Sequence, residues 1–240
     1  MNLSGPSALR QSVLCLVLMA ATLFLESGTG LDLTLQRCWY DASAGAWTVD
    51  ASFHEAWRWL FYDGAKRFVA FVGVLSVLLA GYGLCSGRRT LFRAGLLMAL
   101  SCALTPLLVS FLKAVTGVYC PRQLEIFGGH APYRHVFMPS GGVSGGRCFP
   151  GGHASGGFAL TMLYFCLPGR RAAAAALILA LAAGWIMGLY QMMRGEHFLS
   201  HTIMSMLLAW QMNVVLVLLA DRVILPFAEG RRAFGSGRRR

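Results

Sequence analysis

Charged residues are scarce in this chain. Only 13% of its 240 residues are Asp, Glu, Lys or Arg, whereas about 25% of an ordinary soluble domain is charged. Hydrophobic residues make up 56%, and the mean hydropathy is +0.58. This balance excludes a soluble globular protein and predicts one embedded in a membrane. The formal net charge is +11, but the basic residues separate apolar segments instead of lining one surface, which argues against a nucleic-acid partner.

Long apolar runs divide the chain into six predicted membrane spans. A helix needs about 20 residues to cross a bilayer, and the first and fourth runs are shorter than that. We expect an all-α polytopic membrane protein, a six-transmembrane-helix bundle that forms one domain over residues 1–240. The runs cover residues 12–25, 68–85, 94–112, 154–167, 172–193 and 198–220.

The charges between the spans predict the orientation. The connections at 86–93 and 168–171 and the tail at 221–240 are rich in arginine, and by the positive-inside rule they face the cytoplasm. Six spans then place both termini in the cytoplasm. We expect a bacterial inner (plasma) membrane protein with an outer loop at 26–67. Because no Ala-x-Ala cleavage site follows the first run, residues 12–25 are predicted to be an uncleaved signal anchor.

All six histidines fall outside the cytoplasm or at the outer ends of spans in this topology. Histidine changes its charge near neutral pH and is a frequent proton donor, proton acceptor or metal ligand. The one-sided set therefore predicts an active site at the periplasmic face. The six are His54, His130, His135, His153, His197 and His201.

Three of the seven cysteines, Cys38, Cys120 and Cys148, also face outward. In an oxidising periplasm two of these thiols can pair. A bond between Cys120 and Cys148 would close the loop between the third and fourth spans, and we state that pairing as a hypothesis.

Two parts of the predicted catalytic loop 113–153 suit an anion. Lys113 ends the third span and Arg122 follows a proline, so both side chains can reach the same anion. The sequence Pro150-Gly-Gly-His153 then opens the fourth apolar run. Its glycines let the backbone approach a ligand closely, and free N–H groups at a helix start, here around Gly152, suit a phosphate.

A second catalytic loop is predicted at 194–205, between the fifth and sixth spans. If it is helical, Arg194, His197 and His201 lie at i, i+3 and i+7 and share one face. Placing a charged side chain close to the bilayer core costs a few kcal/mol of free energy. Ionisable groups at this depth are therefore expected to face a polar cavity or a ligand.

Together these stretches resemble the type 2 phosphatidic acid phosphatase superfamily of integral-membrane lipid phosphatases. That family has a lysine followed after six residues by Arg-Pro, then Pro-Ser-Gly-His at a helix start, then Ser-Arg, five residues, His, three residues and Asp. Here Lys113 is followed after six residues by Cys120-Pro121, Pro150-Gly-Gly-His153 stands for the second motif, and His197 and His201 have the spacing of the third.

The chain departs from the family pattern at three positions. Cys120 stands where the first motif has arginine, with Arg122 two residues later as a substitute. Gln191 stands where the third motif has arginine, with Arg194 one turn later. His201 replaces the aspartate that orients the nucleophile, and a neutral histidine stabilises a developing imidazolium less than a carboxylate does.

The resemblance implies a reaction that needs no metal and no cofactor. His197 attacks the phosphorus to give a phosphohistidine, His153 protonates the leaving oxygen and then activates water, and His201 orients His197. Three cations and the N–H groups at a helix start hold the phosphoryl oxygens. These groups belong to Lys113, Arg122, Arg194 and Gly152.

The substrate and two other readings stay open at this point. An outward site has access to undecaprenyl pyrophosphate, lipid A, phosphatidylglycerol phosphate and phosphatidic acid, so the expected partners are a lipid phosphate and the surrounding membrane lipids. The family also contains phosphotransferases. A metal-binding membrane protein with histidine ligands and a lipid-binding protein without turnover are the alternatives. Clustered cations favour a phosphate over a metal ion, and the sequence leaves the oligomeric state open.

An aromatic stripe marks the predicted outer loop. Phe53, Trp57, Leu60 and Phe61 lie at i, i+4, i+7 and i+8. This spacing predicts an amphipathic helix in the outer interface, more readily an anchor than a border of the lipid entry.

Overall fold

The computed structural model describes residues 5–138 and 145–224, and most of these residues are helical. Among them, five helical stretches are long and apolar enough to cross a membrane. The protein is therefore a polytopic helical membrane protein, as its low charge predicts. The stretches are Gly5–Gly28, Ala51–Cys85, Arg89–Gln123, Arg170–Met193 and Leu199–Arg222.

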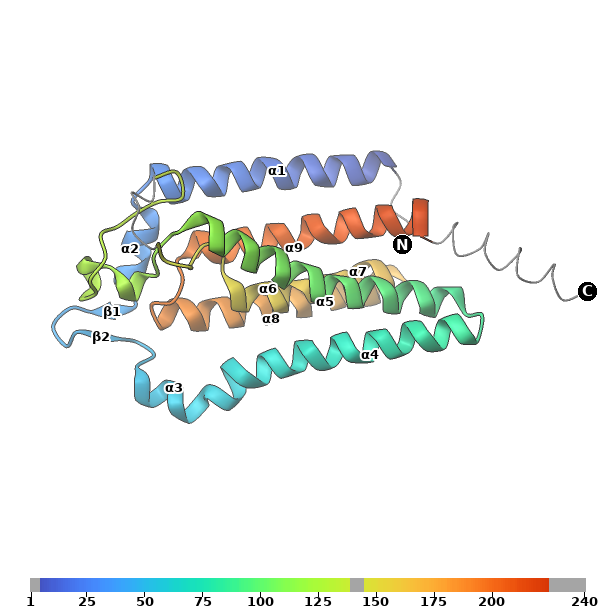
Figure 1. Cartoon of the computed structure of the whole chain (residues 1–240), viewed down its shortest axis with the longest axis horizontal. Coiled ribbons are helices and arrows are strands. Elements are labelled where there is room, and N and C mark those ends of the chain that lie inside the picture. The colour runs from blue at the N-terminus through green and yellow to red at the C-terminus, as the bar shows by residue number, and fades with distance from the viewer. Residues whose placement is uncertain (1–4, 139–144, 225–240) are drawn as a thin grey trace, which may run out of the picture.

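The long helices run side by side along the long axis of the molecule (Figure 1). α1 packs on α9 and α4 packs on α5. The start of α1 lies beside the end of α9, since a Cβ atom on Gly5 would lie 3.1 Å from a guanidinium nitrogen of Arg222. The first and last long helices thus share one end of the bundle, and the side of the membrane that this end faces stays a prediction. The helices are α1 (Gly5–Gly28), α4 (Ala65–Cys85), α5 (Arg89–Thr116), α8 (Arg170–Met193) and α9 (Leu199–Leu219).

The fourth predicted span differs from the prediction. It consists of α6 (Gly152–Ala159), the 3₁₀ turn η4 (Leu160–Met162) and α7 (Leu163–Cys166). Fifteen residues rise about 22 Å at the helical rise of 1.5 Å per residue, which is less than the roughly 30 Å of a bilayer core. The expected six long spans are therefore five in the described part of the chain, and the broken segment packs among α5, α8 and α9.

Glycines and a buried hydrogen-bond network accompany the 3₁₀ turn, whose flanking residues Ala159 and Leu163 keep right-handed helical dihedral angles. Gly156 and Gly157 lie within α6, and glycine is a poor helix former. Where α6 ends, the hydroxyl of Ser101 on α5 lies 2.9 Å from the carbonyl oxygen of Ala159 and 2.6 Å from Oδ1 of Asn213 on α9. Hydrogen bonds of this kind hold helices together where no water competes.

Short elements cover the end of the bundle opposite the start of α1 (Figure 1). The antiparallel pair β1–β2 places Tyr40 opposite Trp47. The rings of Tyr40, Trp47 and Phe127 pack together with centroids 4.9 to 5.4 Å apart. The predicted outer loop 26–67 is therefore a folded cap. The short elements are α2 (Leu31–Arg37), β1 (Tyr40–Asp41), β2 (Ala46–Trp47), α3 (Ala51–Arg58), and the 3₁₀ turns η2 (Pro121–Gln123) and η3 (Glu125–Phe127).

The amphipathic stripe lies on α3 and the π-helix η1 (Trp59–Gly64), which leads directly into α4. Asp50 caps α3 by accepting the N–H of Phe53 at 2.7 Å. Phe53, Trp57 and Leu60 are each more than 40% exposed, which agrees with a helix whose apolar face meets lipid.

Close approach of α6 and α8 gives a first prediction. A Cβ atom on Gly157 would lie 2.7 Å from the Cα atom of Gly184, so Gly157→Ala must push the two helices apart. We expect it to lower the free energy of unfolding by about 1–3 kcal/mol, measured by thermal unfolding of the purified protein in detergent. Gly81→Ala is the matched control, because a Cβ there meets nothing within 4 Å. Equal stability of the two variants would contradict the packing described.

Candidate active site

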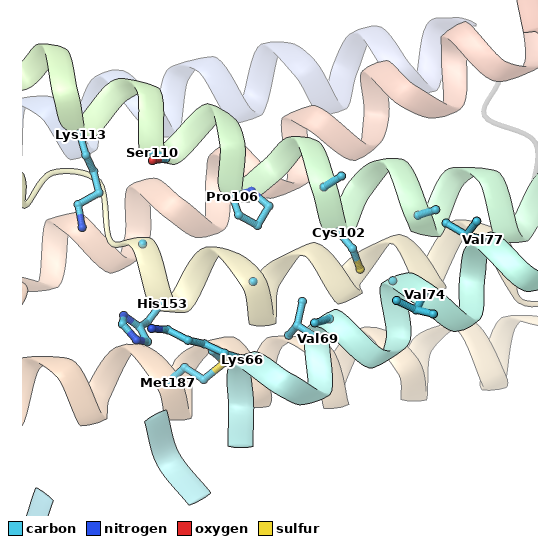
Figure 2. A pocket seen from close by; sticks show the side chains of 16 residues that line it. Lys66, Val69, Val74, Val77, Cys102, Pro106, Ser110, Lys113, His153 and Met187 are labelled. Atoms are coloured by element: carbon cyan, nitrogen blue, oxygen red, sulfur yellow. The ribbon is translucent and has the colours of Figure 1, made fainter. Parts of the chain in front are cut away.

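The residues that the sequence predicts for the site come together at the covered end of the bundle. Lys113 lies in the last turn of α5, His153 in the first turn of α6 and His201 in the first turn of α9, while Arg194 caps the end of α8. Figure 2 shows the Lys113 side chain reaching from α5 toward His153 on α6. Because these groups stand at helix ends, the packing of the bundle sets their geometry.

Because Gly152 has no side chain, the amine of Lys113 can approach the start of α6. A Cβ atom on Gly152 would lie only 3.3 Å from Nζ of Lys113. Gly151 is the N-cap residue and supplies no side-chain acceptor to the free N–H groups of the helix. A helix N-terminus and an ammonium are both positive, so an anion between them is favoured.

Cys120 and Cys148 form a disulfide, the pairing stated as a hypothesis above. Sγ of Cys148 lies 3.3 Å from Nδ1 of His197. The disulfide therefore ties the residues that follow α5 to those that precede α6, and it holds both against His197, which is 4% exposed.

Burial keeps the imidazole of His197 uncharged. Its burial, followed by the charges of His201 and Lys113, lowers the pKa of His197 well below the usual 6.5. A neutral imidazole has a free lone pair, and with Nδ1 against Cys148 that lone pair is available on Nε2. His197 is thus in the protonation state that a nucleophile needs.

His201 lies beside His197, with ring centroids 5.7 Å apart. In the described part of the chain neither ring nitrogen of His201 has a hydrogen-bond partner, so the hydrogen bond that would orient His197 is not formed. The rings of Phe149 and Phe198 pack edge-on against His201, at 5.1 and 5.3 Å. The side chain is therefore held by aromatic packing.

Three atoms in this region have the spacing of metal ligands. Sγ of Cys148 and one ring nitrogen each of His197 and His201 lie within 4.8 Å of one another. Cys148 offers no thiolate while it is bonded to Cys120. Lys113 also acts on His197 as a neighbouring positive charge, so the donor set fits an anion better than a metal cation.

Arg194 and Arg122 are joined through one carboxylate. Glu196 lies 3.5 Å from a terminal nitrogen of Arg194 and 3.3 Å from Nε of Arg122. Arg194 also donates to Oε1 of Gln191 at 3.1 Å, the position where the family has its own arginine. The side chain of Arg194 is 14% exposed and that of Arg122 is 56% exposed, so Arg194 is the inner of the two cations.

A cavity of about 640 Å³ opens between α4 and α5 and ends at the predicted site (Figure 2). Its polar end is formed by Lys66, Lys113 and His153. Its walls are apolar, and they include Val69, Val74 and Val77 from α4 and Cys102 and Pro106 from α5. The cavity thus joins a cationic end to an apolar groove between two candidate membrane spans.

A second cavity, of about 410 Å³, lies on the outer side of Arg194. It is polar, and Arg122 opens onto it instead of onto the cavity that contains Lys113 and His153. The two cavities are therefore separate, with Arg194 and Glu196 lining the outer one. Its remaining lining residues include Trp47, Asp50, His54 and Arg58.

Three residues of this region were missed by the sequence analysis. Tyr62 lies with its ring centroid 4.2 Å from that of His153, and Lys66 lines the same cavity as His153. Asp32 accepts the N–H of Ser200 at 3.0 Å and also the hydroxyl of Ser200. No sequence signal connects Asp32 with Ser200, whereas the i, i+4 spacing of Tyr62 and Lys66 was visible but had no motif to mark it.

Asp32 acts as the missing cap of α9. The N-cap residue Phe198 has no side-chain acceptor, and the carboxylate from α2 takes that role. Asp32 is 1% exposed, so the bond is protected from water and fixes the first turn of α9, which carries His201.

The comparisons with known proteins agree with this geometry. The family model of the PAP2 superfamily matches residues 94–224, a range that starts within α5 and includes α6 to α9. This match confirms the resemblance to the type 2 phosphatidic acid phosphatases. No curated protein and no solved structure matches the chain.

Removal of the α9 cap gives a second prediction. Asp32→Ala leaves the buried Ser200 N–H and hydroxyl without an acceptor, so we expect a loss of about 1–3 kcal/mol in the free energy of unfolding, read from thermal unfolding in detergent. Asp32→Asn keeps one acceptor oxygen and should lose less. A smaller loss for alanine than for asparagine would refute the capping role.

Proposed function

The chain belongs to the PAP2 superfamily, and we propose that it is a membrane lipid phosphatase that works through a phosphohistidine on His197 and needs no metal. Membership of the superfamily implies phosphatase or phosphotransferase activity on phosphate-bearing substrates. The lipid substrate, the intermediate and the roles of single residues are our proposal.

The observation that carries the proposal is the cationic end of the apolar cavity. Lys66, Lys113 and His153 end a groove walled by α4 and α5. A phosphate at the polar end and a hydrocarbon chain in the groove would satisfy both surfaces, because each part of such a ligand meets a matching environment. A water-soluble phosphate would leave the apolar walls unused.

The first chemical step uses the neutral imidazole of His197. Nε2 attacks the phosphorus, and the bond from phosphorus to the leaving oxygen breaks with its electron pair on that oxygen. Burial and then the charges of Lys66 and Lys113 lower the pKa of His153 to about 3; a phosphate anion bound between these lysines offsets their charge, and His153 then gives a proton to the leaving oxygen. Lys113, Arg194 and the N–H groups around Gly152 stabilise the charge of the transition state.

The second step returns the enzyme to its starting state. His153, now neutral, takes a proton from water, and the oxygen attacks the phosphohistidine. The bond between phosphorus and Nε2 breaks, which frees His197 and inorganic phosphate. His201 positions His197 by packing, and Arg122 serves the outer cavity, where it steers anions toward Arg194.

The proposed setting is the periplasmic face of a bacterial inner membrane, with both ends of the chain in the cytoplasm. The disulfide between Cys120 and Cys148 supports an oxidising compartment at this end of the bundle. The arginine-rich connections at 86–93 and 168–171 lie at the other end of the bundle (Figure 1). Undecaprenyl pyrophosphate, lipid A, phosphatidylglycerol phosphate and phosphatidic acid are the candidate substrates.

The outer cavity favours one alternative, a lipid phosphotransferase. Transfer to an acceptor other than water requires a second binding space next to the phosphohistidine. The outer cavity, of about 410 Å³, is lined by Arg194, which is also one of the cations that the proposal assigns to the phosphate. Release of free phosphate without an acceptor distinguishes hydrolysis from transfer.

Loss of the nucleophile gives a third prediction. Purified protein in detergent should release phosphate from at least one of the four candidate lipids, in the presence of a chelator as well as without it. His197→Ala should reduce the release to background, and Arg194→Ala should reduce it by about 100- to 1,000-fold. His130→Ala, the loss of an exposed histidine, is the control and should leave the rate unchanged.

Several results would contradict this scheme. Wild-type rates in His197→Ala would exclude the phosphohistidine, and activity abolished by the chelator would favour the metal-binding reading. Lipid binding without turnover would favour a non-catalytic relative.

The lowered pKa of His197 gives a fourth prediction. The nucleophile must be unprotonated, and its pKa lies well below 6.5, so inactivation by protonation of His197 begins only at a correspondingly low pH. We expect the acidic limb of kcat/KM against pH to fall well below pH 6.5. The measurement is a pH profile of phosphate release, and a limb at or above pH 6.5 would show that His197 is not held neutral by its surroundings.

A further inference from the structure

The two lysines of this chain, Lys66 and Lys113, line the same cavity as His153. We propose that Lys66 is a second phosphate ligand, which supplies the positive charge that the first motif loses at Cys120. This inference rests on the proposed function, because it names a further residue that contacts the same phosphate.

The side chain of Lys66 is directed at the site. Figure 2 shows Lys66 extending from the start of α4 toward His153, while Lys113 reaches the same region from α5. Two ammonium groups directed at one imidazole repel each other in the empty cavity. A phosphate between them turns that repulsion into attraction, because each amine can then donate to a separate oxygen.

Tyr62 holds Lys66 in this position without cancelling its charge. Nζ of Lys66 lies 4.0 Å from the ring centroid of Tyr62, and Cζ of Arg194 lies 5.6 Å from the same centroid. A ring face attracts a cation but carries no net charge. Tyr62 therefore gathers Lys66, Arg194 and the ring of His153 around one aromatic side chain.

The neighbouring arginines Arg58 and Arg122, in contrast, are each paired with a carboxylate. Arg58 is paired with Asp63 at 3.0 Å, and Arg122 is paired with Glu196 at 3.3 Å. Within the described residues no carboxylate lies within the 4.0 Å of a salt bridge to Lys66. Its full charge is thus available to a ligand.

The backbone just before Lys66 is unusual. Lys66 follows the π-helix η1 inside the continuous helical stretch Ala51–Cys85, and π-helical turns occur frequently at functional sites. This turn places Tyr62 and Lys66 beside His153.

The substitution at Cys120 explains why a second lysine is needed. The first motif of the family has an arginine at this position, and here the residue is bonded to Cys148 and carries no charge. Arg122, its nearest substitute in sequence, opens onto the outer cavity and is 56% exposed. Lys66 instead opens onto the cavity that holds Lys113 and His153.

The test compares Lys66→Ala, Lys66→Arg and Arg67→Ala with the wild type. Arg67 is the matched control, because it is the next residue, is also exposed and does not line the cavity. Two readouts are used: kcat/KM for release of phosphate from the best lipid, and binding of orthovanadate, a phosphate analogue, followed by thermal shift in detergent. The vanadate readout needs no turnover.

We expect Lys66→Ala to lower kcat/KM by about 100-fold and to weaken vanadate binding, Lys66→Arg to retain most of both, and Arg67→Ala to match the wild type. If Lys66→Ala behaves as Arg67→Ala does, Lys66 is an interfacial lysine and the inference is wrong, although the phosphatase proposal stands. If the wild type neither releases phosphate nor binds vanadate, the proposed function fails first. Equal losses in both alanine variants would show a general effect of surface charge and would also overturn the inference.

Discussion

Concentrated positive charge at the covered end of an apolar bundle is the constraint on which the rest of this structure depends. Lys113 meets the positive start of α6 at Gly152, and Arg194 shares the carboxylate of Glu196 with Arg122. In a medium of low dielectric such charges are costly unless an anion joins them. The proposed phosphate would join these charges, and the apolar groove beside them would hold whatever is attached to it.

Contacts between distant segments fix the helix ends that bear the site. Asp32 caps α9 from α2, the disulfide joins the residues after α5 to those before α6, and the N–H of Gly151 donates to the carbonyl of His201 at 2.9 Å. Two of these contacts join segments that carry predicted site residues, and the third fixes the first turn of α9 from α2. The folded cap therefore helps to set the distances between the predicted site residues at the helix ends.

The sequence predicted what depends on composition and local spacing. Five of the six spans, the helical stripe on α3 and the convergence of Lys113, His153 and His197 follow from apolar runs and motif spacing. It did not predict the 3₁₀ turn within residues 152–166, nor the hydrogen bond that Ser101 of α5 donates to the carbonyl of Ala159 beside that turn, because this contact joins two different helices. Asp32 and Lys66 were not predicted for the same reason. Their roles depend on partners on other elements, and no motif in the sequence marks them.

Two of the departures from the family motifs each remove a charge near His197. Cys120 removes a positive charge beside the nucleophile, and His201 removes the negative charge of the aspartate. Both changes concern groups packed around His197, since Cys148, the partner of Cys120, touches its Nδ1 and the His201 ring lies 5.7 Å away. In place of the aspartate that orients the nucleophile in the family, the disulfide sulfur and the neutral ring of His201 pack against His197, so contact instead of charge positions this imidazole.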